Sequence, residues 1–519
     1  RVPATAARTW PHFKEGNDMT FHRQRLAAVL LALLLPGAST CAVAAGPALR
    51  ISTAERADSE ASRTAPAAKV SWRAADPAAA PRARLRYGDL SARRIADMGT
   101  ANAARDGHRP APLQIGIGRS AAREQAGASR PALRWTAVPG GGQAATFEVT
   151  SPVAMGLRVG LKLEGLPAGA ELRFLGSEWP LGDVLLATAK EIAASTVDGV
   201  YWTPPTDGET QTIEIYLPAG ASPQALRVDA PELSHLLTNG RRDFKILEKI
   251  GESGTCNIDT ACRVATLGSE FVAAKNAVAH MVFNLFRTNG TVYGTYICTG
   301  TLLNDTDPDT QVPLFYTANH CFAGGSGDVP AQDRQRVAAT LSTHWNYEAT
   351  ACDSGVSTPQ TTLTGGADLL FYEANTDAML LRLRDPAPAM ATFAGWDATV
   401  MAANSDVVAI HHPAGDAKKV SFGRQIPAAS DGVNHGVGWL SGTTEGGSSG
   451  SGLFTVGVDG RYRLRGGLYG GNAACSNSGN LGNSQNRDWY SRLDVVFPQI
   501  RRYLMPLVRR NGGQPLAPR

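Results

Sequence analysis

The chain has 519 residues and a formal net charge of +4 at pH 7, so it is long enough for several domains and only mildly basic. Binding to nucleic acid needs a concentrated basic stripe, and such a small excess gives no support for it. Hydrophobic residues make up 43% of the chain, glycine and proline number 55 and 31, and long helical periodicity is scarce, which favours a β-rich protein.

The N-terminal part predicts a secretory signal peptide. Residues 1–18 precede the first methionine, Met19, and we interpret them as an upstream extension. Basic residues then lead into an apolar run from Leu26 to Leu35, which is too short to span a membrane, and small residues follow it. We therefore expect residues 19–45 to be removed and the remaining protein to be secreted without a membrane attachment.

Two different patterns occupy the next part of the chain. Residues 46–130 are rich in Ala, Arg, Ser and Pro, which predicts a low-complexity pro-region or linker with some helix around Tyr87 to Met98. Residues 131–230 contain short alternations of apolar and polar residues between Gly/Pro turns, which predict a small antiparallel β-sandwich. The alternating stretches are 145–150, 157–163 and 212–217. This region has no cysteine and no acid–base cluster, so we expect a folding or packing domain.

The second half of the chain has the composition of a separate domain. Residues 231–250 are a polar connector with several lysines and arginines. Residues 251–507 concentrate the cysteines, aromatic residues and histidines among short predicted strands with Gly-rich turns. The apolar spacing of residues 493–504 predicts one C-terminal helix. Residues 508–519 are expected to form a disordered tail.

The cysteines predict a disulfide-bonded, exported domain. Seven are present, and Cys41 would leave with the signal peptide. An even number in an exported chain predicts disulfides, although spacing alone leaves their pairing open. A zinc site is the competing interpretation, but no pair has the tight Cys-x-x-Cys spacing. The six remaining cysteines are Cys256, Cys262, Cys298, Cys321, Cys352 and Cys475.

Three segments together predict a serine nucleophile with its base. A serine hydroxyl needs a base within hydrogen-bond reach, and the base needs a partner that holds its tautomer. His320 stands beside a cysteine in Thr-Ala-Asn-His-Cys, Asp377 precedes a predicted buried strand, and Ser449 lies between glycines in Gly-Ser-Ser-Gly-Ser. Each motif alone has a structural explanation, but their conjunction in the order His, Asp, Ser is that of the chymotrypsin class.

The serine loop also predicts an oxyanion hole. Glycines allow the backbone to turn sharply, so that the N–H groups of Gly447 and Ser449 can point together at a developing oxyanion. Ser448 and Ser451 are the rival serines, and Asp368 is the rival acid. The flanking pattern favours Ser449, and the Gly-Gly-Ala stretch before Asp368 is typical of a turn.

Further segments of the second half carry a resemblance to a known family. They are Cys256-Asn-Ile-Asp259, Cys298-Thr-Gly-Thr-Leu302, Trp345-Asn-Tyr347, Gly395-Trp-Asp397 and Ile410-His-His-Pro413. From Gly251 onward the chain resembles the lysyl endopeptidases, which are bacterial secreted trypsin-like peptidases. The resemblance implies an all-β, chymotrypsin-like double β-barrel, and three bridges that pair Cys256 with Cys475, Cys262 with Cys352, and Cys298 with Cys321. It also favours a structural role for His411 and His412, so we expect no metal and no cofactor.

The resemblance places the specificity pocket at a different position from that of trypsin. Thr443 stands six residues before Ser449, where trypsin-like enzymes carry an acid. In lysyl endopeptidases the acid lies beyond the last cysteine, which implies Asp488 as the partner of a substrate lysine, with Thr444 nearby. Tyr469, Gly470 and Gly471 should pair with the substrate as an added strand. Tyr469 replaces a family histidine and Trp439 does not obviously replace a family tryptophan, so strict preference for lysine over arginine is left open.

These observations predict a secreted serine endopeptidase that cleaves peptides after lysine through an acyl-enzyme. Lys249 precedes the mature-like segment, so the enzyme could release its own pro-region there, or after Arg241 or Arg242. The β-sandwich would then act as an intramolecular chaperone and inhibitor, and we expect a monomer whose partners are protein and peptide substrates. The alternatives are a peptidase with Arg or mixed preference, and an inactive homologue that serves in binding or adhesion.

Overall fold

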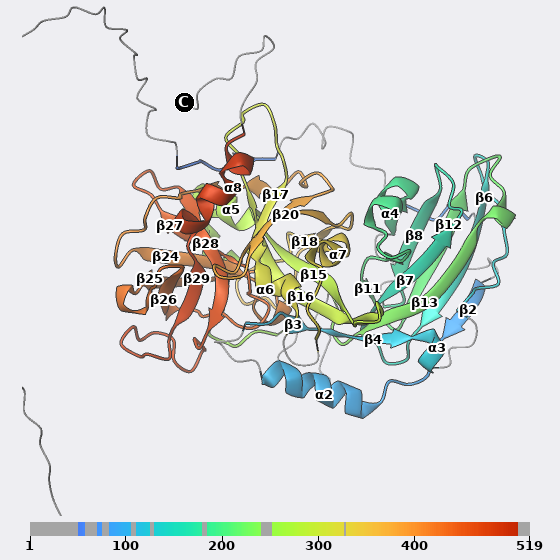
Figure 1. Ribbon diagram of the computed structural model, residues 1–519, viewed down its shortest axis with the longest axis horizontal. Helices are drawn as coiled ribbons and strands as arrows, with labels where there is room; N and C mark the ends of the chain where they lie inside the picture. The colour runs from blue at the N-terminus through green and yellow to red at the C-terminus, as the bar shows by residue number, and fades with distance from the viewer. Residues whose placement is uncertain are drawn as a thin grey trace, which may run out of the picture. The chain divides into compact units, whose positions relative to one another are not determined.

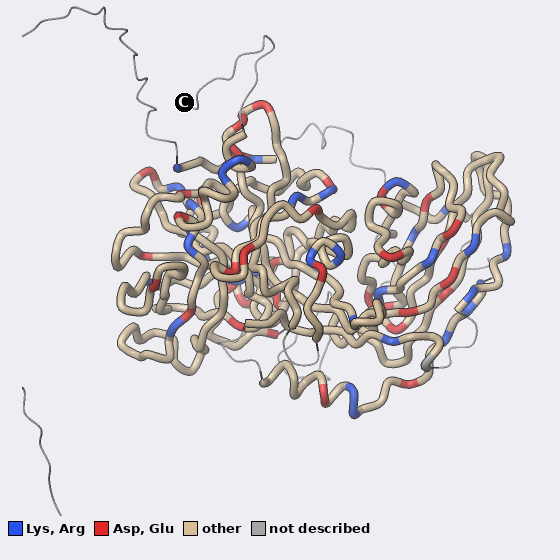
Figure 2. Tube along the Cα trace, in the orientation of Figure 1, with Lys and Arg blue, Asp and Glu red and all other residues tan. Residues whose placement is uncertain are grey.

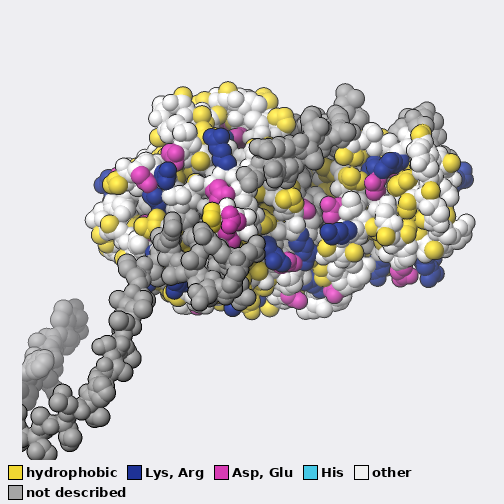
Figure 3. Space-filling model, turned by 90° about the horizontal axis from the view of Figure 1, so that it is seen from above, with side chains coloured by type: hydrophobic (Ala, Val, Ile, Leu, Met, Phe, Trp, Pro, Cys, Tyr) yellow, Lys and Arg dark blue, Asp and Glu magenta, His cyan; other side chains and the backbone are white. Residues whose placement is uncertain are grey.

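Figure 1 shows the computed structural model, in which the described residues are 50–57, 70–74, 82–104, 110–124, 129–178, 184–239, 252–325 and 329–506. Four predicted features lie outside the described residues: the upstream extension, the signal peptide, the cleavage site at Lys249 and the C-terminal tail 508–519. No described helix is long and apolar enough to cross a membrane. Basic and acidic side chains are interspersed along the trace and over the face drawn in space-filling form (Figures 2 and 3).

The predicted β-sandwich is present, and two sheets enclose its core. One sheet has the order β2 (Arg82–Arg86), β6 (Gln143–Thr150), β12 (Thr210–Leu217), β8 (Glu171–Gly176) and β9 (Leu185–Thr188), with β5 (Thr136–Ala137) beside β6. The other has the order β10 (Tyr201–Trp202), β7 (Gly156–Glu164), β13 (Arg227–Leu236) and β4 (Gly116–Ser120), with β11 (Thr206–Asp207) beside β7. The predicted alternating stretches correspond to β6, β7 and β12, in which alternate side chains, such as Val159 and Ile213, are fully buried between the sheets.

Residues 46–130, predicted as a low-complexity pro-region or linker with some helix, also contain strands that this prediction missed. Strands β2 and β4 are members of the two sandwich sheets, and β2 pairs in parallel with β6. Between them lies α2 (Ala92–Ala103), which partly confirms the predicted helix and begins at Ser91, whose hydroxyl caps it. Periodicity missed β2 and β4 because each has few apolar residues and gains its burial from neighbours distant in sequence. The predicted connector also starts too early, because β13 continues to Leu236.

The first half of the second domain forms one curved sheet. Its order is β19 (Thr361–Leu363), β18 (Ser342–Trp345), β15 (Val278–Phe286), β16 (Val292–Leu303), β17 (Leu314–Ala318), β21 (Ala378–Leu383) and β20 (Ala367–Glu373). The helices α5 (Val264–Asn276), α6 (Asn319–Ala323) and α7 (Arg334–Ala339) accompany it. Residues such as Phe283, Phe315 and Phe322 are fully buried in its core.

The second half closes into a barrel. Its strands follow the order β25 (Lys419–Gln425), β24 (Asp406–His411), β27 (Gly452–Val456), β28 (Tyr462–Gly471), β29 (Asp488–Ser491) and β26 (Asn434–Ser441), and β26 pairs back onto β25. The short strand β14 (Ile258–Asp259) adds to β25. Between the halves run β22 (Thr392–Phe393) and β23 (Gly395–Trp396). The C-terminal helix is confirmed as α8 (Leu493–Leu504), and Phe497 packs on Trp396. The mostly-β, double-barrel fold that the resemblance implied is therefore confirmed.

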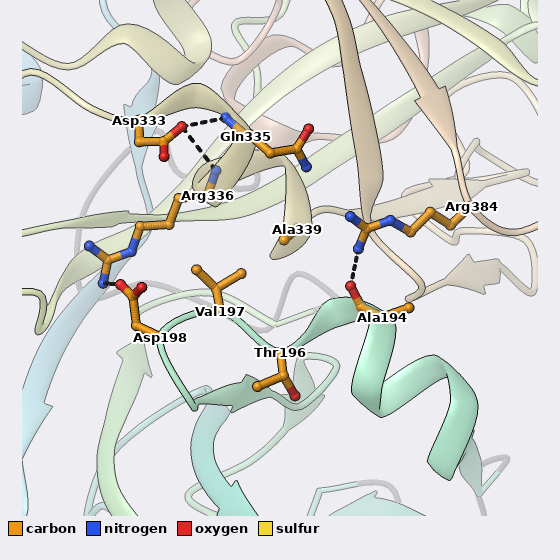
Figure 4. A pocket seen from close by; sticks show the side chains of 9 residues that line it. All are labelled: Ala194, Thr196, Val197, Asp198, Asp333, Gln335, Arg336, Ala339 and Arg384. Carbon is orange, nitrogen blue, oxygen red and sulfur yellow. Dashed lines mark hydrogen bonds and ion pairs between the residues drawn. The ribbon is translucent and has the colours of Figure 1, made fainter.

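Residues of the N-terminal half contact the second domain at several places. The strand β3 (Leu113–Gln114) pairs with β16, and α3 (Ala121–Glu124) follows β4. The helix α4 (Ala189–Ser195) and the turn after it face α7 across a cavity of about 470 Å³ (Figure 4). In this cavity Arg336 forms an ion pair of 3.0 Å with Asp198, and Arg384 donates to the Ala194 carbonyl.

Candidate active site

His320 and Asp377 form the best-defined pair of the site. The Asp377 carboxylate accepts the backbone N–H of His320 at 2.7 Å through Oδ1, and it binds Nδ1 of the ring at 2.6 Å through Oδ2. Because an ionised carboxylate only accepts, Nδ1 is the protonated ring nitrogen and Nε2 carries the lone pair. Both side chains are buried. The two bonds fix both the backbone and the ring of His320.

The local backbone places the two residues opposite each other. His320 is the second residue of α6, which follows β17 directly, and Asp377 stands immediately before β21, the neighbour of β17 in the sheet. The Asp377 backbone is left-handed, with φ +54°, a conformation that aspartate tolerates better than most residues. Its carbonyl accepts the N–H of Asn319 at 2.8 Å while its carboxylate turns to His320. Such an unusual backbone is typical of functional sites.

Ser449 lies in a tight loop between β26 and β27. Gly447 and Gly450 have φ of +97° and +80°, which favours glycine at both positions. The N–H groups of Gly447 and Ser449 donate no hydrogen bond to any described residue, although both lie in a buried loop. Thr299 of β16 anchors the loop, because its N–H donates to the Ser449 carbonyl at 2.8 Å and its hydroxyl to the Gly447 carbonyl at 2.9 Å. The two amides are therefore available for an oxyanion.

Ser449 and the ring of His320 are not hydrogen-bonded to each other in this structure. Among the described residues, Nε2 of His320 has no hydrogen-bond partner, so its lone pair is not engaged by the Ser449 hydroxyl. The Ser449 carbonyl lies 3.9 Å from the sulfur of Cys321, the residue after the histidine. Catalytic hydrogen bonds are often long in unliganded sites and tighten when substrate binds.

The rival residues have other partners. Ser448 is fully buried and its hydroxyl lies 2.8 Å from Nδ1 of His411, while Ser451 is also fully buried. Asp368 forms ion pairs of 2.8 Å with both Arg382 and Arg384 and makes no contact with His320. Among these candidates, the hydrogen bonds therefore single out Asp377 as the acid that orients the histidine.

Asp488 is buried at the start of β29, where that strand pairs with both β26 and β28. Its Oδ2 accepts a hydrogen bond of 2.6 Å from the Trp439 indole and one of 2.7 Å from the Thr444 hydroxyl. Only 1% of Asp488 is exposed, and this burial raises its pKa, opposed by the bonds from Thr444 and Trp439. No cation pairs with it among the described residues. A buried carboxylate that lacks a cationic partner is suited to receive one from a substrate.

Strand β28, which pairs with β29 at Asp488, carries three of the predicted substrate-binding residues, Tyr469, Gly470 and Gly471. Tyr469 stands edge-on to the His320 ring, with centroids 6.4 Å apart. Gly471 pairs with Asp488 across β28 and β29, and any side chain at Gly471 would collide with the Asp488 carboxylate. The structure therefore places Tyr469 beside His320, and Thr444 and Gly471 beside Asp488.

Comparisons with known proteins give a consistent family. The model of the lysyl endopeptidase C-terminal domain matches residues 250–491, and that of the lysyl endopeptidase N-terminal domain matches residues 86–237. A lysyl endopeptidase from Pseudomonas aeruginosa is 36% identical over 502 residues, which cover 93% of this chain and 99% of that protein. The chain belongs to the lysyl endopeptidase family. Its activity is that of a peptidase of this family.

Three disulfides brace the peptidase domain. They join Cys256 to Cys475, Cys262 to Cys352, and Cys298 to Cys321, which are the pairs implied by the family resemblance. The third links β16 to α6 directly after His320, so it holds the base against the strand that anchors the serine loop. Disulfides of this kind are typical of proteins that fold outside the reducing cytosol.

The paired histidines belong to the buried interior. His412 stacks on Tyr347 with ring centroids 5.5 Å apart, and its Nδ1 lies 2.9 Å from the Asp416 carbonyl. The rings of His280 and His412 are 5.3 Å apart, and those of His280 and His344 are 5.8 Å apart. Nε2 of each of these three histidines is buried without a partner among the described residues. Burial lowers the pKa of all three, to about 4 for His344.

Sequence reasoning missed two residues that shape this family site. Trp439 holds the Asp488 carboxylate, although no sequence motif pointed to it. Thr299 anchors the serine loop from another strand. It lies within the Cys298 motif, but nothing in its spacing predicted a contact with a loop 150 residues away.

Proposed function

We propose that this protein is a secreted serine endopeptidase that cleaves peptide bonds after lysine and is made as a zymogen. The observation that carries the proposal is the pair of hydrogen bonds from the Asp377 carboxylate to His320, which leaves Nε2 as a base beside the serine loop. An acid that holds the histidine in this tautomer is what a base that activates a serine needs, and this supports the proposal.

The residues support an acyl-enzyme route. The Ser449 oxygen attacks the peptide carbonyl as His320 Nε2 takes its proton, and the Asp377 carboxylate stabilises the resulting imidazolium. The amides of Gly447 and Ser449 bind the oxyanion, and each such donor contributes on the order of 100- to 1000-fold in rate. The imidazolium then protonates the leaving amine, and a water activated by His320 hydrolyses the ester.

The preference for lysine rests on Asp488. A lysine ammonium that reaches this carboxylate replaces water with a charge-assisted hydrogen bond, whereas a neutral side chain leaves the buried acid unpaired. Cleavage of a proteome-derived peptide mixture, followed by mass spectrometry, tests the activity and the preference together. Products that end mainly in arginine would favour the mixed-specificity alternative. A serine-directed phosphonate that fails to label Ser449 would favour an inactive homologue.

The position of β3 supports the pro-region as an inhibitor. Leu113 and Gln114 are the strand partners of Ile297 and Tyr296, two and three residues before the Thr299 that anchors the serine loop. Asn102 of α2 binds both the N–H and the carbonyl of Gln114 from the other side. A substrate that added a strand to this edge of β16 would compete with β3.

Release of the pro-region is proposed to be autocatalytic, at Lys249 or at a nearby arginine. N-terminal sequencing of the secreted protein tests this. We expect a start near residue 250 in the wild-type protein, and an uncut chain when Ser449 is replaced by alanine. A mature start far from residue 250, or unchanged processing of Ser449→Ala, would contradict autocatalysis.

A further inference from the structure

Residues 50–57, which we call the strap, lie along the segment that joins the two barrels. Within the strap, β1 (Glu55–Arg56) pairs with β22 through Glu55 opposite Phe393 and Arg56 opposite Thr392. Backbone hydrogen bonds continue on both sides of this pair. The Ser52 N–H donates to the Trp396 carbonyl at 2.8 Å, and the Ala57 N–H donates to the Ala391 carbonyl at 3.1 Å. In the other direction, the Ala398 N–H donates to the Arg50 carbonyl at 2.7 Å.

The strap also binds each barrel. On the side of the first barrel, Asn304 donates to the Thr53 carbonyl at 2.9 Å, and Gln311 donates to the Glu55 carboxylate at 2.6 Å and to the Arg56 carbonyl at 2.8 Å. On the side of the second, Arg463 of β28 donates to the Ser52 carbonyl at 3.3 Å. Ala57 is only 8% exposed and belongs to the core of the first barrel.

The site is shaped for an extended peptide with small side chains. A side chain at Gly395 would approach Ser52, Thr53 and Ala54 to within 3 Å, so only glycine allows the strap to lie this close. Ser52 and Ala57 are buried, while Thr53 and Arg56 point to solvent. Some carbonyl groups of the strap are not used in strand pairing. They accept hydrogen bonds from the side chains of Asn304, Gln311 and Arg463.

This position matters because the candidate catalytic residues come from both barrels. His320 and Asp377 belong to the first, and Ser449 lies in a loop of the second. The joining segment from residue 384 to residue 405 contains only the two-residue strands β22 and β23. The segment binds the first barrel through the Asn304 N–H, which donates to the Ala394 carbonyl at 2.9 Å, and the second barrel through the pairing of β23 with β28. The strap supplies bonds to the segment and to both barrels at once.

We propose that the surface formed by β22, Asn304, Gln311 and Arg463 is a docking site for the strap, and that docking sets the relative position of the two barrels. The partner that this site fits is an extended segment of the same chain, Arg50 to Ala57. The inference relies on the proposed function only in treating the strap as part of a removable pro-region. The strap and the sandwich bind the peptidase domain at separate places. Because they belong to one chain, binding of either one raises the effective concentration of the other at its own site.

The test uses the full-length chain with Ser449→Ala, so that neither cutting nor catalytic activity affects the result. The double variant Ser52→Pro/Ala57→Pro removes two N–H groups that bond to the joining segment. The matched control is Arg56→Pro, because the alternation of an antiparallel pair directs the Arg56 N–H away from β22. Hydrogen exchange is measured at Ala398, whose N–H donates to the strap, and at Ile213 in the sandwich core.

We expect exchange at Ala398 to accelerate by about tenfold or more in the double variant, since each lost backbone hydrogen bond shifts an opening equilibrium by roughly fivefold. Exchange at Ile213 should stay within about twofold, as should Ala398 in Arg56→Pro. A double variant that fails to fold while the control folds normally would give the same conclusion. Equal exchange at Ala398 in the double variant and the control would overturn the proposal. These outcomes do not depend on whether the enzyme prefers lysine.

Discussion

The clearest prediction concerns the replacement of Asp488 by asparagine, which keeps the shape of the side chain and removes its charge. Asp488 is 1% exposed, and its hydrogen bonds come from the uncharged groups of Trp439 and Thr444. A substrate lysine would therefore meet a desolvated carboxylate whose charge no protein cation offsets among the described residues. Loss of one partner of such a buried charge pair costs about 2–5 kcal/mol.

This magnitude corresponds to a fall in kcat/KM of roughly 30- to 5000-fold for a lysine substrate. The assay compares peptides that differ only at the residue before the cut, lysine against a neutral isostere, so that the ratio isolates the pocket. The matched control is Asp368→Asn, which removes a carboxylate paired with Arg382 and Arg384 and should change the ratio by less than about twofold. If Asp488→Asn cut lysine substrates as well as the wild type did, or lost both substrates equally, Asp488 would not be the specificity acid.

The same variant has an expected dependence on pH and a small effect on stability. Burial raises the pKa of Asp488, so the charged form needed for lysine is lost at a higher pH than for an exposed aspartate. The KM for lysine should therefore rise as the pH falls through this raised pKa, and that rise should be absent in Asp488→Asn. Because the folded pKa lies above the unfolded value, the charge on Asp488 opposes folding at higher pH. We expect the Tm of the variant to lie within about 4 °C of the wild type.

Three further results follow from the geometry of the site and its surroundings. Asp377→Asn should lower kcat by about 10,000-fold with a smaller change in KM, because asparagine would hold the wrong tautomer of His320. A kcat that stays near the wild-type value would argue against this role. Replacing both Cys298 and Cys321 by alanine should lower the free energy of unfolding by about 3 kcal/mol, measured by denaturant titration of Ser449→Ala; an unchanged midpoint would contradict this. Because burial lowers the pKa of His344 to about 4, its contribution to stability should be complete above the unfolded value near 6.5 and should fall by up to about 1.4 kcal/mol per pH unit between there and about pH 4. His344→Gln should remove that share of the slope, and an identical slope would refute it.

A buried arginine adds to the contacts between the N-terminal half and the peptidase domain. Arg158 of β7 is almost fully buried, and it donates to the Thr340 carbonyl at 2.9 Å and to the Asn284 side chain at 3.4 Å. Burial lowers the pKa of this guanidinium to about 10. Strand pairing by β3, the strap and Arg158 thus involve separate parts of the peptidase domain. If residues 50–239 are removed as proposed, all of these contacts must separate.

Local patterns were enough for the triad candidates and for much of the fold. The alternation of β6, β7 and β12 survives in the structure because each strand has one face in a core. The helix α8 was predicted to its ends because its apolar stripe covers the barrels. The motifs around His320, Asp377 and Ser449 were recognisable because each combines a reactive residue with the glycine, cysteine or strand that positions it. Such information lies within a few residues and needs no knowledge of distant contacts.

Other features were decided only by tertiary structure. Strands β2 and β4 have too few apolar residues to show a period, and they became strands because sheet edges were available to them. The indole of Trp439 reached Asp488 because β26 and β29 pair across a closed barrel, and no spacing along the chain encodes that contact. The strap likewise binds residues more than two hundred positions away. Periodicity reports which face of an element is buried, whereas the partner that buries it is set only when the elements pack.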